Sequence, residues 1–133
     1  MTGELRVPID GDLDIVKARQ EGRRVAGDLG FTLIDRALVA TAISELARNI
    51  VRYAKRGVIV IRTVNNTNAR GIQVVARDDG PGIRDIDRAL QLGFSTSGGL
   101  GLGLSGVKRL MDEFSIQSRV SRGTVVTITK WKH

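Results

Sequence analysis

Hydrophobic and polar residues follow a helical period over three long segments of this chain. The strongest spans residues 32–54, a second spans 12–30 and a third spans 102–114, and a shorter helix is expected over 85–92. Each pattern predicts a helix with one apolar face. In the strongest segment the apolar positions are Leu38, Ala42, Ile43, Leu46, Ala47 and Ile50. In the third segment they are Leu104, Val107, Leu110 and Met111.

Residues at the ends of the first two helices support these predictions. Asp12 is expected to cap the start of the helix over 12–30, and Gly30 stands where a left-handed residue commonly ends a helix. Thr32 and Asp35 resemble a capping box at the start of the next helix, with Asp in place of Glu.

Runs of β-branched residues separated by turn residues predict two hairpins. The runs GVIVIRTV (57–64) and IQVVARDD (72–79) flank NNTNARG (65–71), whose residues favour turns. Residues 115–131 are expected to form the second hairpin, with its turn at Arg122–Gly123.

The arrangement of these elements along the chain indicates the fold class. Residues 4–9 are expected to form a short edge strand, because Pro8 cannot donate a ladder hydrogen bond. Helices accompany hairpins instead of alternating strictly with single strands. This order predicts an α/β (α+β) two-layer sandwich, with a mostly antiparallel sheet and helices on one face. The length of 133 residues predicts a single domain over 1–133.

Composition narrows the classes of protein. Hydrophobic residues make up 41% of the chain, and there are no cysteines, which excludes disulfides and thiolate metal sites. No apolar run approaches the roughly 20 residues that span a membrane, and the N-terminus lacks the pattern of a signal peptide, so a cytoplasmic protein is expected. The net charge of +7 suits an acidic partner or a polyanionic ligand. Nucleic acid is disfavoured because only five residues are aromatic, although a basic DNA binder with salt-dependent affinity remains an alternative.

The stretch GFSTSGGLGLGLSGVKRL (93–110) is rich in glycine and leads into a predicted helix. GLGLSG (101–106) matches G-x-G-x-x-G, but no hydrophobic strand precedes it and no acid follows at the spacing of a dinucleotide fold. A glycine loop that opens into a helix still suits phosphate, because backbone N–H groups can approach its oxygens. The alternative is a mobile linker, which the leucines at 100, 102 and 104 disfavour.

The motif DDGPGI (78–83) places a carboxylate at the end of a strand. Strand alternation puts Asp78 on the same face as the apolar Ile72, Val74 and Ala76, and puts Asp79 on the wet face. A carboxylate on a buried face needs hydrogen-bond donors, and the amino group of adenine is one such donor. The alternative is an ordinary turn in which Asp78 accepts bonds from backbone N–H groups.

The motif ELARN (45–49) places Glu45 and Asn49 four residues apart on one helix face, beside Arg48 and Arg52. A solvated polar face is one interpretation. In the other, Asn49 supplies an oxygen to Mg²⁺, and Glu45 lies near a transferable phosphate and takes a proton from the attacking hydroxyl.

Taken in order, ELARN, DDGPG, GLGLGL and the Gly-Thr pair at 123–124 resemble the N, G1, G2 and G3 boxes of the GHKL ATPase superfamily, whose members adopt the Bergerat ATP-binding fold. The resemblance covers nearly the whole chain. The stretches ISELARNI and GFSTSGGLGLGLSGVKRLMDEF are similar to the RsbT-type serine/threonine protein kinases, the switch kinases of the bacterial stressosome.

The resemblance implies a role for each matching residue. Glu45 would be the general base or would orient the nucleophile, and Asn49 would bind ATP and ligate Mg²⁺. Asp78 would bind the adenine amine in a pocket shaped by Gly80 and Gly82, and Thr124 would bond near that contact. The phosphate loop and its lid would comprise Ser95, Thr96, Ser97, Gly98, Gly99, Leu100, Gly101, Leu102, Gly103 and Leu104.

The resemblance also implies the protein partners. Substrates would be STAS-domain scaffold and antagonist proteins of the RsbR and RsbS type, and the output would be a PP2C-type phosphatase or another enzyme. The single histidine, His133, is the last residue, so we expect the phosphate acceptor to lie on another protein and not on a histidine of this chain. Related anti-sigma factors, which use kinase chemistry mainly to sequester a sigma factor, are the alternative.

Overall fold

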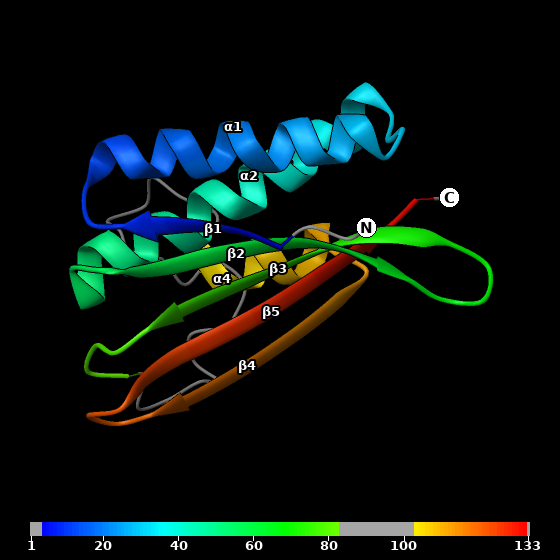
Figure 1. Ribbon diagram of the computed structural model, residues 1–133. Coiled ribbons are helices and arrows are strands. Elements are labelled where there is room, and N and C mark those ends of the chain that lie inside the picture. Colours follow the sequence, from blue (N-terminus) through cyan, green and yellow to red (C-terminus); the bar gives the residue numbers. More distant parts are fainter. Residues whose placement is uncertain (1–3, 83–102, 133) are drawn as a thin grey trace.

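The computed structural model describes residues 4–82 and 103–132, in which a five-stranded sheet carries helices on one face (Figure 1). The strands are β1 Glu4–Ile9, β2 Gly57–Asn65, β3 Arg70–Asp78, β4 Glu113–Arg119 and β5 Gly123–Trp131. The helices are α1 Asp12–Asp28, α2 Leu33–Asn49, the π-helical turn η1 Ile50–Ala54, and α4 Gly103–Leu110. The predicted helix over 85–92 falls outside the described residues.

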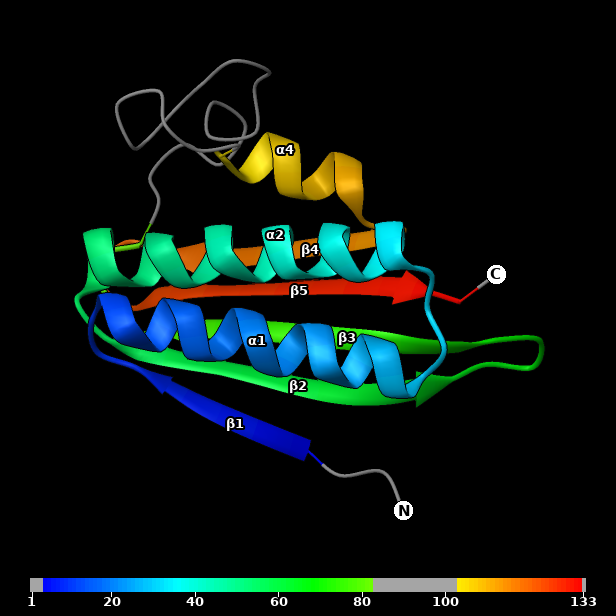
Figure 2. The same ribbon diagram turned by 90° about the horizontal axis from the view of Figure 1, so that it is seen from above.

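The sheet has the strand order β1-β2-β3-β5-β4, and each neighbouring pair is antiparallel. The predicted α/β sandwich with an edge strand at residues 4–9 is therefore confirmed. Figure 2 shows α1 and α2 side by side over the sheet, with α4 beside α2. Side chains that alternate along the strands form the core against these helices, among them Ile59, Ile61, Ile72 and Val74.

The residue that caps helix α1 lies one position earlier in the chain than the sequence suggests. Gly11, not Asp12, is the capping residue, and Asp12 is the first residue of the helix. The carboxylate of Asp14 accepts hydrogen bonds from the backbone N–H groups of Asp10 at 2.8 Å and Gly11 at 3.2 Å. The side-chain hydrogen bonds at the start of α1 thus come from Asp14 and engage N–H groups that precede the helix. The predicted left-handed Gly30 is confirmed, with φ 86°.

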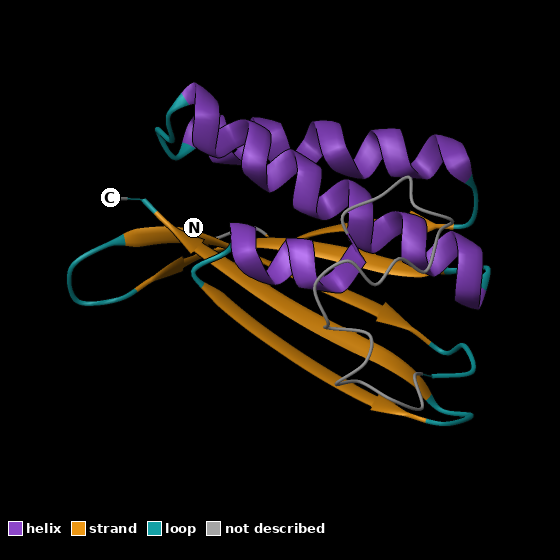
Figure 3. Cartoon of the chain, turned by 180° about the vertical axis from the view of Figure 1, so that it is seen from behind, coloured by secondary structure: helices purple, strands orange, loops and turns teal. Residues whose placement is uncertain are grey.

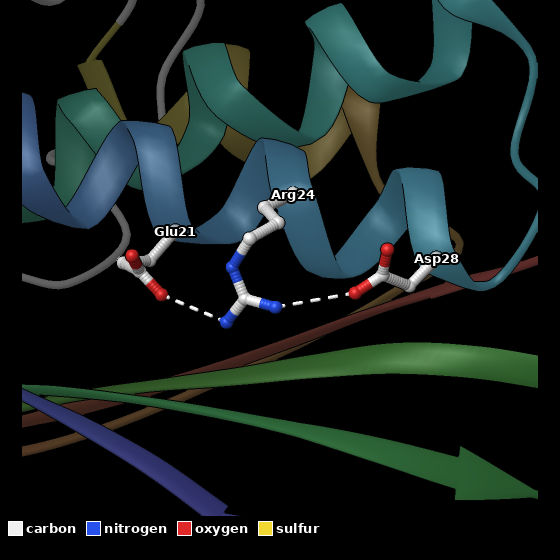
Figure 4. Close-up of polar contacts among 3 residues, drawn as sticks. All are labelled: Glu21, Arg24 and Asp28. Carbon is white, nitrogen blue, oxygen red and sulfur yellow. Dashed lines mark hydrogen bonds and ion pairs between the residues drawn. The ribbon is translucent and has the colours of Figure 1, made fainter.

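The solvent side of α1 carries a three-residue ion-pair ladder (Figure 4). The Arg24 guanidinium donates to Glu21 Oε2 at 2.9 Å and to Asp28 Oδ2 at 3.1 Å. These carboxylates, Glu21 most of all, raise the pKa of Arg24. Because the ladder is solvent-exposed, screening keeps its contribution to stability small.

Helix α2 begins as predicted but ends differently. The Thr32 hydroxyl accepts a bond from the backbone N–H of Asp35 at 3.1 Å. The regular helix stops at Asn49, and the remainder of the predicted helix over 32–54 is the wider turn η1. In this turn Ile50 is buried. Ala54 lies against Gly80, where an added Cβ on the glycine would be only 2.6 Å from the Ala54 Cβ. The wider turn therefore allows close contact between the end of α2 and the loop after β3.

Helix α4 is shorter than the prediction over 102–114, because Glu113 and Phe114 belong to β4. The backbone N–H of Asp112 donates to Thr129 at 3.0 Å, and Glu113 pairs with Thr129 in the sheet. The Lys130 ammonium donates to the carbonyl of Leu110 at 3.2 Å and so satisfies a free carbonyl at the end of the helix. Contacts with β5 therefore decide where the helix ends.

Both predicted hairpins are confirmed, with small shifts at their ends. Strand β3 ends at Asp78, one residue before the predicted end. In the first turn, Asn66 Oδ1 accepts bonds from the backbone N–H groups of Asn68 and Ala69. The second turn contains Ser121 at positive φ, and Gly123, also at positive φ, begins β5. Within the described residues, none of the helices combines the length and apolarity needed to cross a membrane.

The residue after η1 provides a test of this fold. Lys55 has φ 72° and ψ −42°, a conformation that strains residues with a Cβ. Lys55→Gly is expected to have a free energy of unfolding about 1 kcal/mol higher than Lys55→Ala, because alanine keeps the Cβ and glycine does not. Urea unfolding of both variants measures the difference. A glycine variant no more stable than the alanine variant would contradict the strained conformation.

Candidate ATP site

Glu45 lies in the interior, contrary to the interpretation of a solvated polar face. Its side chain is 3% exposed, while that of Arg48 is 34% exposed. Arg48 Nη1 donates to Glu45 Oε1 at 2.7 Å, and the backbone N–H of Gly103 donates to Glu45 Oε2 at 3.3 Å. The carboxylate thus joins α2 to the first residue of α4, where free N–H groups and the helix dipole favour negative charge.

Asn49 is the last residue of α2, four residues after Glu45. Its Oδ1 atom is buried and has no hydrogen-bond partner among the residues that the structure describes. Buried side-chain oxygens are almost always bonded, so an unpaired one indicates a place for a ligand. A neutral amide oxygen suits Mg²⁺, which takes few protein ligands together with phosphates and water. Among the described residues no group of three or more His, Cys, Asp or Glu side chains could hold a metal by itself.

Asp78 ends β3 on the core side of the sheet, as strand alternation predicts. It is half-buried, and its Oδ1 accepts a bond from the backbone N–H of Gly80 at 2.9 Å. Burial raises the pKa of Asp78, and the charge of Asp79 adds to the rise, whereas backbone bonds from Gly80 and Thr124 act in the opposite direction. A further donor in this place would offset the cost of burying the charged form.

Thr124 lies directly opposite Asp78 on β5. Its side chain is buried, and its Oγ1 is 2.8 Å from Ser118 Oγ. Two segments far apart in the sequence therefore meet at the Asp78 carboxylate, one carrying the DDGPG motif and the other the Gly-Thr pair.

Gly80 and Gly82 pack against neighbouring backbone. Gly80 lies against Ala54 of η1, and Gly82, at φ 79°, leaves no room for a Cβ beside the carbonyl of Arg119. The backbone N–H of Ser121 also donates to the carbonyl of Pro81 at 2.8 Å. These glycines let the loop after β3 lie between η1 and the turn that joins β4 to β5.

Sequence reasoning missed Gly57, the first residue of β2, which lies between the end of α2 and the end of β3. A Cβ added to Gly57 would lie 3.0 Å from Ile50 Cγ2 and 3.1 Å from Asp78 Cβ. Ile50 directly follows Asn49, so the end of α2 and the end of β3 approach each other across this glycine. The only signal in the sequence is a glycine at the start of a β-branched run.

The described part of the glycine stretch begins at Gly103, which has φ 67° and starts α4. Leu104 is buried in the core beneath it. Figure 3 shows α4 lying along the helix-covered face of the sheet. The remaining predicted loop residues, Ser95, Thr96, Ser97, Gly98, Gly99, Leu100, Gly101 and Leu102, fall outside the described residues.

A hollow of about 90 Å³ lies on the opposite face of the sheet. Its lining comes from β1, β2 and β3: Glu4, Arg6, Val58, Val60, Arg62, Val75 and Arg77. Val75 and Arg77 alternate with Ala76 and Asp78, which point toward the helices. The hollow is therefore separate from the candidate ATP site.

Comparison with known proteins identifies the family. A family model described as histidine kinase-, DNA gyrase B-, and HSP90-like ATPase matches residues 34–133. The serine/threonine-protein kinase RsbT of Bacillus subtilis (strain 168) is 53% identical over 131 residues, which cover 98% of this chain and 98% of that protein. The chain belongs to the RsbT-type serine/threonine protein kinases of this ATPase family. It is therefore an enzyme that uses ATP.

More distant relatives share the fold of this kinase. An anti-sigma F factor of Caldanaerobacter subterraneus subsp. tengcongensis is 34% identical over 112 residues, covering 80% of this kinase and 77% of that protein. A crystal structure of the RsbU and RsbW domains of a Mycobacterium tuberculosis protein aligns with a TM-score of 0.70 at 18% identity, over 98% of this kinase and 33% of that chain. The catalytic domain of the histidine kinase ThkA aligns with a TM-score of 0.55 at 16% identity, over 99% of this kinase and 96% of that chain.

The raised pKa of Asp78 predicts how stability depends on pH. A raised pKa means that the folded state favours the protonated carboxyl of Asp78. Its contribution to the free energy of unfolding is therefore fully present below the ordinary pKa of 3.8 and is lost as the pH rises through the higher pKa of the folded state. Asp78→Asn, which cannot ionise, is expected to be more stable than the wild type at neutral pH, with a gain that shrinks toward acid pH. Urea unfolding of the nucleotide-free protein across this range measures the gain.

Asp79→Asn is the matched control for this measurement. Asp79 is exposed, and its charge adds to the cost of ionising Asp78. Asp79→Asn is expected to raise the free energy of unfolding at neutral pH, as Asp78→Asn does, but by a smaller amount. A destabilised Asp78→Asn protein at neutral pH would show that burial is not the dominant influence on this carboxyl.

Proposed function

We propose that this kinase transfers the γ-phosphate of ATP to a serine or threonine of STAS-domain scaffold and antagonist proteins of the RsbS and RsbR type. By partner switching it then activates a PP2C-type phosphatase or another output enzyme in bacterial stress signalling. The chain acts as one ATPase domain in the cytoplasm, with neither nucleic acid nor membrane as a partner. The observation that carries the proposal is the buried Glu45 carboxylate bonded to the first residue of α4.

The nucleotide is held at its two ends by different segments. The Asp78 carboxylate accepts a hydrogen bond from the adenine amine, beside Thr124 and within a pocket formed by Gly80 and Gly82. The raised pKa of Asp78 supports this assignment, because a carboxyl disfavoured in its charged form gains most from an added donor. The loop from Ser95 to Leu104 holds the phosphates with its backbone N–H groups and the N-terminus of α4.

Asn49 ligates Mg²⁺ together with the phosphates. The buried Oδ1 has no hydrogen-bond partner within residues 4–82 and 103–132, and metal coordination would satisfy this atom. When bound, the metal ion neutralises charge on the transferring phosphoryl group.

Glu45 acts as the general base or orients the acceptor. The acceptor hydroxyl attacks the γ-phosphorus, a new P–O bond forms, the bond to the ADP oxygen breaks, and the hydroxyl proton passes to Glu45. Phosphoryl transfer depends mainly on positioning and on charge stabilisation, so a carboxylate fixed by two hydrogen bonds is suited to this step.

A second candidate function is sequestration of a sigma factor. It is favoured by the 34% identity to a protein named as an anti-sigma F factor. The two functions differ in what the purified protein binds. The proposed function requires phosphorylation of a STAS-domain protein and an output enzyme that binds this kinase, whereas the alternative requires a stable complex with a sigma factor.

Glu45→Gln tests the catalytic role. The amide keeps the shape of the side chain and one acceptor oxygen but cannot take a proton, so phosphoryl transfer is expected to fall by about 10²- to 10⁴-fold while ATP affinity changes little. Labelled ATP, Mg²⁺ and a purified STAS-domain protein, followed by phosphosite mapping, measure the transfer. Glu21→Gln on the outside of α1 is the matched control and is expected to retain activity. Undiminished transfer by Glu45→Gln would remove Glu45 from the mechanism.

Asp78→Asn tests the adenine contact. Loss of a charge-assisted hydrogen bond of about 1.5–3 kcal/mol is expected to weaken ATP binding by about 10- to 150-fold. Calorimetry with ATP measures this affinity, and Asp79→Asn should bind ATP like the wild type. Equal affinities for the Asp78→Asn and wild-type proteins would refute the assignment.

A further inference from the structure

The two oxygens of the Glu45 carboxylate are held by different elements. Oε1 accepts from Arg48 within α2, and Oε2 accepts from the backbone of Gly103, 58 residues away. Two bonds in different directions fix both the position of the carboxylate and its rotation about the last side-chain bond. Of these two donors only Arg48 is a side chain, so it is the one that substitution can remove.

Burial makes this ion pair different from an ordinary surface pair. The Glu45 side chain is 3% exposed, and an ionised carboxylate at that depth requires a charged or strongly polar partner. Arg48 reaches it from one helical turn further along α2, with its own side chain partly in solvent. Its remaining N–H groups can therefore stay hydrated while one of them serves the buried oxygen.

We propose that Arg48 is the positioning residue for Glu45: its guanidinium holds Oε1, so that the carboxylate stays in one orientation and presents its other oxygen at the N-terminus of α4. The inference rests on the proposed function, in which Glu45 receives or orients the acceptor hydroxyl. Arg48 acts through Glu45 and contacts neither nucleotide nor acceptor. It therefore affects the rate of transfer and not the binding of ATP.

The geometry also distinguishes arginine from lysine at this position. The planar guanidinium donates along fixed directions, whereas an ammonium is a point charge at the end of a flexible chain. Arg48→Lys keeps the charge and loses the fixed direction, so it should retain part of the function. Arg48→Met removes the charge and keeps much of the apolar stem.

The test compares Arg48→Met, Arg48→Lys, Glu45→Gln and the double variant Glu45→Gln with Arg48→Met. The assay is transfer from ATP to a purified STAS-domain protein, with kcat and the KM for ATP measured separately. Arg48→Met is expected to lower kcat by about 10- to 100-fold, as for a misplaced catalytic group, with the KM for ATP within about twofold of wild type. Arg48→Lys should recover part of kcat. In the Glu45→Gln background, Arg48→Met should cause no further loss, because the two residues act as one unit.

Arg52→Met is the matched control. Arg52 lies one helical turn beyond Arg48, is exposed, and is expected to leave both constants unchanged. Circular dichroism of each variant checks folding, and Arg48→Lys keeps the test decisive if Arg48→Met does not fold. Normal transfer by both Arg48→Lys and Arg48→Met would overturn the inference. So would a double variant in which the two substitutions lower kcat independently, or a raised KM for ATP in Arg48→Met.

The failure of the inference can be separated from the failure of the proposed function. If Glu45→Gln transfers phosphate at the wild-type rate, the assignment of Glu45 is wrong, and the role of Arg48 is overturned with it. If Glu45→Gln is impaired and Arg48→Met is not, Glu45 remains the catalytic residue and only the role of Arg48 is overturned.

Discussion

The arrangement of the site depends on the hydrogen bond that the buried Glu45 carboxylate accepts from the backbone of Gly103. This carboxylate connects α2 to the N-terminus of α4, and its negative charge matches the positive end of that helix dipole. Lys130 matches the opposite end through its bond to Leu110. A short helix of eight residues is thus held at both ends by charged side chains from other elements. Neither contact can be lost without leaving a buried or half-buried polar group unpaired.

A second constraint acts at the end of β3, where the chain folds against itself through residues without side chains. Gly57, Gly80 and Gly82 allow Ile50, Ala54 and the turn after β4 to approach the Asp78 segment closely. The half-buried Asp78 has a raised pKa, so its charge opposes folding in the absence of a further donor. The same environment increases what a ligand donor can contribute. A ligand donor at this residue would therefore gain from the same burial that opposes folding of the charged form.

Most features decided by neighbouring residues were predictable from the sequence, although the cap of α1 was misplaced by one residue, whereas features decided by distant contacts were harder to predict. Thr32, Gly30 and the turn at Asn66 were predictable because their bonds lie within a few residues. The end of α4 was not, because Glu113 leaves the helical pattern to pair with Thr129 of β5. The burial of Glu45 was also missed, because Gly103, far along the chain, donates to its carboxylate. The motif order indicated the family, but periodicity alone left a solvated polar face as one interpretation of this position.

Helix α2 sets the spacing between the separate parts of the site. Glu45 and Asn49 are one helical turn apart, about 6 Å along the axis at 1.5 Å per residue. The π-helical turn then changes the spacing, so that Ala54 lies against Gly80 in the loop that follows Asp78. Helix α2 and the turn η1 together therefore carry the proposed base, the proposed metal ligand and the contact with the Asp78 loop in a fixed order. The buried face of α2 is tightly packed in the core. A displacement of Glu45 would therefore also displace Asn49, one turn further along the same helix.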